Sequence, residues 1–169
     1  MKTSFAIIII TLLSLTACSV QYSFSGANID PNIKTFSIKY FDNVSGNGIA
    51  TMGDLFTDAL RDKMLRETNL VMVEDESKAD VNFSGKIIQY YYTVQAPTGD
   101  ESSDIRRITM NVKVNYKNNL VEDDSWETDF QNIAEHSVDI DLTSIEEESI
   151  STINTLLVDD IFNKAFAKW

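Results

Sequence analysis

Apolar side chains recur along this chain with two periods, one typical of strands and one typical of helices. Residues 34–41, KTFSIKYF, alternate between apolar and polar positions, which predicts a half-buried strand. Residues 51–68 carry apolar side chains three and four positions apart, which predicts an amphipathic helix. Four further strands are predicted, at residues 69–75, 80–95, 106–117 and 125–134.

A long amphipathic helix is predicted to end the chain. Thr143 or Ser144 is expected to cap it, because Glu146 and Glu147 follow three residues after each and could close a capping box. The buried stripe of this helix is expected to be Ile150, Ile153, Leu157, Ile161 and Ala165. The order of elements predicts an α+β fold, a two-layer sandwich in which two helices pack on one face of a four- or five-stranded mixed sheet.

The other face of the predicted sheet is polar. Its positions carry hydroxyls, amides, Lys and Arg, and acids enter only at Glu127 and Asp129. We consider two interpretations: the ordinary solvated face of a sheet, or a docking surface for an anionic group. The outward residues are Thr35, Ser37, Lys39, Asn82, Ser84, Lys86, Arg107, Thr109, Asn111, Lys113, Asn115 and Lys117. The candidate binding cations, taken from this region, are Lys39, Lys86, Arg106, Arg107, Lys113 and Lys117.

Three consecutive tyrosines, Tyr90, Tyr91 and Tyr92, fall within the predicted strand at residues 80–95. Because side chains alternate along a strand, two of the rings point to one face and the third to the other. Packing in the core and at the sheet edge is one interpretation. Contact with a partner is the other, since tyrosine is enriched at interfaces.

The N-terminus has the features of a secretory signal. Lys2 precedes about eleven apolar or small residues, which is too short for a permanent membrane span. The residues LTAC, 15–18, resemble a bacterial lipobox. That resemblance implies that the sulfur of Cys18 receives a diacylglycerol, that the signal is cut before Cys18 and that the new amino terminus is acylated, which gives a durable anchor. The expected organisation is a signal peptide at 1–17, a tether at 18–33 and one domain at 34–169.

Composition argues against several functions. The formal net charge is −12, which disfavours binding to nucleic acid. A lone cysteine can form neither an intramolecular disulfide nor a zinc site by itself. His136 is the only histidine, and the serines near glycine match neither a nucleophile elbow nor a phosphate loop. We therefore expect no enzyme, no metal and no cofactor.

Several segments together resemble the lipopolysaccharide-assembly lipoprotein family, LptE, in its Bacteroidetes-type form. They are the lipobox, the following SVQYSFSG, the strand segment PNIKTFSIKYF, the helix DLFTDALRDKMLRETNL, the strand RITMNVKVNY and the C-terminal VDDIFNKAFAKW. The resemblance covers essentially the whole chain after the signal. YSFSG and DIFNKA are its most specific parts.

This resemblance implies an outer-membrane lipoprotein that faces the periplasm. It also implies a partner, the β-barrel of the lipopolysaccharide translocon, which the domain plugs and helps to assemble, and possible direct contact with lipopolysaccharide. The candidate cations are assigned by their place on the sheet and match no motif of the family. The alternative is a membrane-anchored ligand-binding module of the cell envelope, unrelated to lipopolysaccharide. No acidic run follows Cys18, which favours the periplasmic side.

Overall fold

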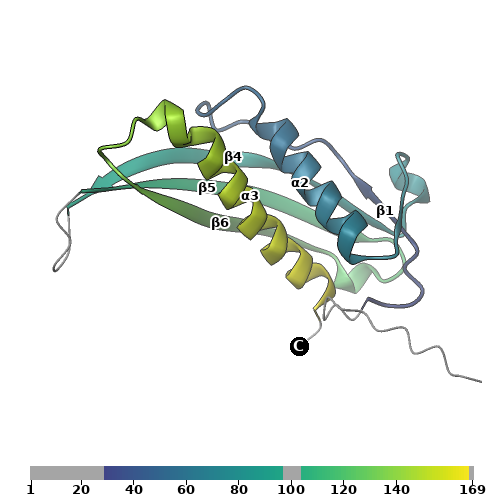
Figure 1. Cartoon of the computed structure of the whole chain (residues 1–169). Helices are drawn as coiled ribbons and strands as arrows, with labels where there is room; N and C mark the ends of the chain where they lie inside the picture. Colours follow the sequence, from purple (N-terminus) through teal and green to yellow (C-terminus); the bar gives the residue numbers. More distant parts are fainter. Residues whose placement is uncertain (1–28, 97–103, 168–169) are drawn as a thin grey trace, which may run out of the picture.

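The computed structural model describes residues 29–96 and 104–167 and forms two layers, a mixed sheet and two helices on one of its faces (Figure 1). The α+β prediction is confirmed. The strands are β1 (Thr35–Ile38), β2 (Asp42–Asn43), β3 (Val71–Met72), β4 (Val81–Gln95), β5 (Ile105–Asn118) and β6 (Trp126–Ser137). The helices are α2 (Met52–Glu67) and α3 (Leu142–Phe166), and two single 3-10 turns lie at Glu76–Lys78 and Glu122–Asp124. The predicted signal peptide, at residues 1–17, and Cys18 lie outside the described residues.

The sheet has the strand order β3-β1-β4-β5-β6, with β2 pairing to β4 beside this path. β1 runs parallel to both β3 and β4, so β1, α2 and β3 form a βαβ unit. β4, β5 and β6 are antiparallel and make up the long part of the sheet. The total of six strands exceeds the expected four or five because β2 has two residues, too few to produce a periodic pattern.

The core lies between the helices and the sheet. On α2, Met52, Phe56, Leu60 and Met64 are fully buried, as their spacing predicts. On β5, every second residue from Ile108 to Tyr116 is buried. The predicted stripe of α3 is also correct, since Ile150, Ile153, Leu157 and Ile161 are fully buried and Ala165 is partly buried.

A β-bulge in β4 sets the direction of the three tyrosines. The β4–β5 register shifts between Ile87 and Gln89, so the side chains of Ile87 and Tyr90 both face the helices. Tyr92 lies on that same face, opposite Ile108, but 56% of it is exposed, and 42% of Tyr91 is exposed on the other face. The expected division of two rings and one is therefore confirmed.

The predicted cap of α3 is wrong. The helix begins at Leu142, and the capping residue is Asp141, whose carboxylate accepts a hydrogen bond of 2.8 Å from the Thr143 backbone N–H. The same carboxylate binds the Thr143 hydroxyl. These hydrogen bonds hold the pKa of Asp141 below its usual range. An Asp accepts the free N–H groups of a helix start as well as Ser or Thr does, so the apparent capping box one turn later is not needed.

Several residues expected to point outward do so but are shielded by their neighbours. Ser37 and Asn82 face each other across β1 and β4, and the Ser37 hydroxyl donates a 2.5 Å hydrogen bond to Asn82 Oδ1. Both are buried, as is Thr109 between Tyr91 and Ile133 on the neighbouring strands. Burying a polar side chain costs free energy unless it forms a hydrogen bond. The bond to Asn82 removes this cost for Ser37. No helix within the described residues is long and apolar enough to cross a membrane.

Candidate functional site

The candidate site is the face of β4, β5 and β6 that the helices leave uncovered, which we call the open sheet face. The pairing of the strands arranges its side chains in rows across the sheet. One row joins Ser84, Asn115 and Glu127, and the next joins Lys86, Lys113 and Asp129. This face therefore mixes cations, carboxylates and neutral polar groups, and the carboxylates lie next to the cations in the rows.

Lys113 lies at the centre of a charge cluster on this face. Its Nζ is 3.4 Å from Glu127 Oε1 and 3.4 Å from Asp129 Oδ1. Asp129 raises the pKa of Lys113 through its negative charge and its hydrogen bond. Glu127 raises it further through its hydrogen bond and its charge. The two carboxylates lie directly on the strand beside it and neutralise its charge, so Lys113 is poorly placed to attract an external anion.

Two other candidate cations also have carboxylate partners. Arg107 faces Glu135 across β5 and β6, and the two side chains meet at 2.6 Å. Lys39 lies just beyond β1, and its Nζ is 2.6 Å from Glu76 Oε1. Exposed ion pairs of this kind contribute roughly 0–1 kcal/mol to stability. Their main consequence here is that the positive charges of Arg107 and Lys39 are neutralised locally.

Arg106 lies on the opposite face from the other candidates. It pairs with His136 on β6, on the helix side of the sheet. Its guanidinium donates to the backbone carbonyls of Ile140 at 2.7 Å and Val138 at 3.5 Å. These contacts hold the loop that leads into α3, so the geometry gives Arg106 a structural role.

Lys86 and Lys117 are the two candidates with neither an ion pair nor a side-chain hydrogen bond among the described residues, whereas Arg106 has no ion pair but donates to backbone carbonyls. Lys86 faces Lys113 across β4 and β5, whereas Lys117 faces Asn82 four residues further along β5. Four residues of strand span about 13 Å. The two free cations therefore do not converge as a clamp for one phosphate group, and their binding role remains a prediction.

The carboxylates that pair with these cations were only partly expected from the sequence. Glu127 and Asp129 were expected on this face, and Glu135 was not. A usable signal exists, because all three acids of β6 and three of the four basic residues of β5 fall at odd-numbered positions, and therefore on one face of each strand. Cross-strand pairs of opposite charge are favourable, but the pairing of β5 with β6 was needed to match them.

His136 contacts a serine that the sequence gave no reason to connect with it. The hydroxyl of Ser149 lies 2.8 Å from His136 Nε2 and also donates to the Ile145 carbonyl at 2.6 Å. Ser149 lies in the N-terminal part of α3 and is fully buried. A hydroxyl that is committed to a backbone carbonyl and has no access to solvent joins α3 to β6 and is not placed to attack a substrate.

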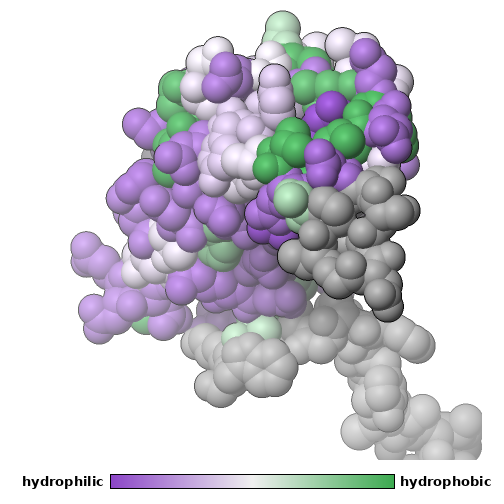
Figure 2. All heavy atoms as spheres, turned by 90° about the vertical axis from the view of Figure 1, so that its left-hand side faces the viewer, coloured by the Kyte–Doolittle hydropathy of each residue, from purple (hydrophilic) through white to green (hydrophobic). Residues whose placement is uncertain are grey.

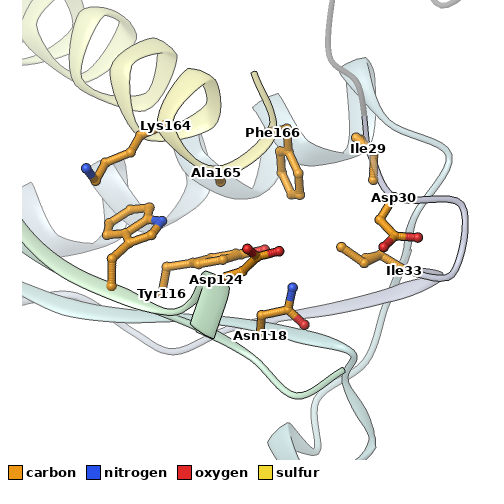
Figure 3. A pocket seen from close by; sticks show the side chains of 10 residues that line it. Ile29, Asp30, Ile33, Tyr116, Asn118, Asp124, Lys164, Ala165 and Phe166 are labelled. Atoms are coloured by element: carbon orange, nitrogen blue, oxygen red, sulfur yellow. The ribbon is translucent and has the colours of Figure 1, made fainter. Parts of the chain in front are cut away.

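A small cavity of about 170 Å³ lies where the C-terminal end of α3 meets the start of the described chain (Figure 3). Tyr116 and Phe166 form its aromatic walls, and Lys164 approaches the Trp126 ring with Nζ 5.3 Å from the ring centre. Burial, together with the charge of Asp124, raises the pKa of Tyr116. The cavity is smaller than the roughly 300–1,000 Å³ of ordinary ligand sites, so it is a secondary candidate.

The end of the sheet where β4 ends and β5 begins has a surface of different polarity. Seen from this end, apolar residues gather in the upper part of the view, toward the helix layer, while hydrophilic residues dominate the lower left (Figure 2). Tyr92, Val94 and Ile140 are the exposed apolar residues in this region. The charged open sheet face and this apolar end are separate surfaces.

The fold places the chain among small two-layer α+β domains with one uncovered sheet face. Residues 33–165 match the family described as "Lipopolysaccharide-assembly", LptE. Because this match covers most of the sequence, the chain belongs to the LptE family, and the family resemblance seen in the sequence is confirmed. No curated protein matches the chain significantly.

Solved structures resemble the chain at low sequence identity. A protein from Helicobacter pylori described as a neuraminyllactose-binding hemagglutinin homologue is 11% identical, with a TM-score of 0.52 over 85% of this chain and 91% of that one. The hypothetical protein CT253 from Chlamydia trachomatis is 10% identical, with a TM-score of 0.50 over 80% and 99%. A minor lipoprotein from Acinetobacter baumannii is 11% identical, with a TM-score of 0.48 over 78% and 91%. At these identities the first two similarities concern the fold alone.

Proposed function

We propose that the chain is an outer-membrane lipoprotein, anchored through Cys18, that plugs and helps assemble the β-barrel of the lipopolysaccharide translocon. In this role it aids the insertion of lipopolysaccharide at the outer membrane. The observation that carries the proposal is membership of the lipopolysaccharide-assembly family over residues 33–165. The anchor would hold the domain on the periplasmic side of the membrane.

The open sheet face supports a role inside a barrel. Large outer-membrane barrels have a polar lumen, and a domain that fills one must present polar groups rather than apolar ones. The ion pairs of Lys113 and Arg107 lie within the domain itself. The barrel wall therefore need not supply matching charges at Lys113 and Arg107, whereas Lys86 and Lys117 would need a partner on the barrel or on a ligand if they were covered.

Direct contact with lipopolysaccharide is a narrower part of the proposal. Phosphate groups of a glycolipid attract lysine side chains that have no other partner. Among the predicted cations, Lys86 and Lys117 meet this condition within the described residues. We propose that a phosphate contact, if the domain makes one, involves one of these lysines at a time.

The domain acts by binding and not by catalysis. Ser149, which is fully buried, contacts His136 in a structural role. Within residues 29–96 and 104–167, no three His, Cys, Asp or Glu side chains cluster as a metal site would require. Its contribution to transport would be to occupy the barrel and stabilise its assembly.

Affinity capture from membranes in mild detergent tests this proposal. We expect the tagged full-length chain to retain one large heat-modifiable barrel protein at equal stoichiometry. A Cys18→Ser variant is the control for the anchor, since it should abolish acylation and reduce recovery from the membrane fraction. Capture of the wild-type chain without a barrel protein would contradict the proposal and favour the alternative, an anchored ligand-binding module.

A further inference from the structure

The outer edge of β6 presents unpaired backbone groups along its length. β6 has 12 residues and pairs with β5 alone, so it forms one margin of the sheet (Figure 1). At the end of the β5–β6 pair, the Val138 N–H donates to the Asp104 carbonyl at 3.1 Å. Hydrogen-bonded and non-bonded pairs alternate in an antiparallel ladder. The even-numbered residues of β6 therefore bond to β5, and the odd-numbered residues direct their N–H and C=O outward.

Most of this edge has no partner within the described part of the chain. The Ser137 carbonyl, at the end of β6, accepts a 3.3 Å hydrogen bond from the Ile140 N–H, but no hydrogen bond from residues 29–96 or 104–167 reaches the outward backbone groups of the odd-numbered residues from Glu127 to Glu135. The strand contains no Pro, Gly or Lys, and its register with β5 continues without a bulge. The opposite margin of the sheet, in contrast, ends in β3, which has two residues. Natural sheets usually shorten, bend or cover a long edge, because such an edge is a template for another strand.

We infer that the outer edge of β6 binds a β-strand of another polypeptide in which cationic and apolar side chains alternate. The cationic positions follow from the open sheet face, where β6 contributes Glu127, Asp129 and Glu135. Lys113 is shared by Glu127 and Asp129 and balances only one of their two negative charges, so this part of β6 keeps a net negative charge. An added strand continues each row of the sheet, so its side chains on this face lie beside these carboxylates. This inference concerns the sheet edge and does not depend on the proposed role in lipopolysaccharide transport.

The apolar positions follow from the helix side of β6. Trp126 and Phe130 lie on this side and are only partly buried. Asp160 of α3 accepts a 3.0 Å hydrogen bond from the Asn132 amide, which places this face of α3 above β6. Leu156 lies one helical turn before Asp160 on the same face of α3 and is exposed. A strand added to β6 would bring apolar side chains against Phe130 and Leu156.

A second copy of this chain is a poor occupant of the same edge. Two β6 strands paired antiparallel about Gln131 would place Glu127 opposite Glu135 of the second copy, and the reverse. Like charges directly opposite each other are destabilising. The acids of β6 therefore disfavour self-pairing and favour a strand of opposite charge.

Amide hydrogen exchange tests the inference in the full-length chain, purified in detergent, with a synthetic peptide as probe. The probe is a twelve-residue peptide of alternating Lys and Val with blocked ends. We expect the amides of Asp129, Gln131 and Ile133 to exchange at least roughly tenfold more slowly with the peptide. The neighbouring even-numbered amides, which already bond to β5, should not change. A peptide in which Glu replaces Lys should give no protection.

Two variants at one position isolate the backbone contact. Gln131→Pro removes one outward N–H and spares the ladder with β5, whereas Gln131→Ala keeps that N–H. We expect the Lys-Val peptide to bind Gln131→Pro roughly tenfold more weakly than Gln131→Ala, a difference of about 1.4 kcal/mol. Equal binding would overturn the inference, and so would unchanged exchange of the odd-numbered amides in the wild-type chain. Protection of those amides without peptide that disappears on dilution would overturn the choice of partner, because it would show self-pairing.

Discussion

Lys113 and Asp129 face each other directly across β5 and β6, with Nζ and Oδ1 3.4 Å apart. Glu127, two residues before Asp129 on β6, lies at the same distance of 3.4 Å from the lysine. The positive charge of Lys113 is therefore neutralised by side chains of the same face. Lys117, on the same strand and face, has no ion pair among the described residues.

The two lysines should therefore respond differently to charge reversal. Lys113→Glu brings a third carboxylate beside Glu127 and Asp129, so we expect a lower thermal midpoint and a further decrease at low salt, where screening is weaker. Lys117→Glu should leave the midpoint unchanged. If these lysines contribute to binding, Lys117→Glu should weaken association with lipopolysaccharide or the barrel without any loss of stability. Thermal unfolding and titration of both variants measure these effects, and unchanged binding by Lys117→Glu would leave only the interpretation as a solvated face.

Asp80 is expected to make folding stability depend on pH. Its Oδ2 accepts hydrogen bonds from the backbone N–H groups of Lys34 at 2.8 Å and Thr35 at 2.9 Å. These bonds hold the pKa of Asp80 below its usual range. A lowered pKa in the folded state means that the stabilisation is present above the unfolded pKa of about 4 and is lost as the pH falls through the folded value.

Replacement of Asp80 by Asn should accordingly lower the free energy of unfolding by about 1–2 kcal/mol at pH 7. The difference from the wild-type chain should shrink as the pH falls below about 4. Denaturant unfolding at several pH values measures it. Asp123→Asn, at an exposed site, is the control. A difference between Asp80→Asn and wild type that stays constant from pH 7 to pH 3 would show that the carboxylate charge is not involved.

Gly85 lies where β4 packs tightly against β5 and the Phe41 ring. A Cβ atom at this position would lie 2.1 Å from the Lys113 carbonyl oxygen and 2.6 Å from the Phe41 ring. We expect Gly85→Ala to destabilise the domain by at least about 2 kcal/mol, because both the strand and the ring are held in place. Ser84→Ala, one residue earlier on the open sheet face, should have a much smaller effect. Equal denaturation midpoints for the two variants would contradict this packing.

We expect the Ser149 hydroxyl to be chemically unreactive despite its contact with His136. Ser149 is fully buried, and its hydroxyl lies 2.6 Å from the Ile145 carbonyl. We expect a fluorophosphonate probe, which labels activated serines, to leave the folded full-length chain unmodified. Mass spectrometry after incubation detects the adduct. Labelling at Ser149 would show that this pair is accessible and reactive, and would reopen the question of catalysis.

Local periodicity predicted most of the elements of this fold. The strict alternation of residues 106–117 corresponds to β5, and the helical stripe of residues 51–68 corresponds to α2. Such patterns can be recognised in a single sequence because each depends only on which side of one helix or strand faces the core. The start of α3 was misplaced because Asp141, Thr143 and Ser144 all have capping chemistry, and only the backbone decides between them.

The charge pattern of the open sheet face was harder to predict. It depends on which strand lies beside β5 and in what register, and both are set by contacts between distant parts of the chain. The bulge near Ile88 illustrates the same limit, since one extra residue decides whether Tyr90 or Tyr91 enters the core. Acids on β6 and cations on β5 are visible in the sequence, but their pairing is a property of the sheet.

The transport of lipopolysaccharide in the native bacterium tests the central claim most directly. The chain is depleted, and newly made, pulse-labelled lipopolysaccharide is measured at the cell surface, with re-expression of the wild-type chain as the control. The proposed role predicts that lipopolysaccharide reaching the surface falls sharply on depletion and recovers on re-expression. Normal surface delivery in depleted cells, with the barrel still assembled, would contradict it.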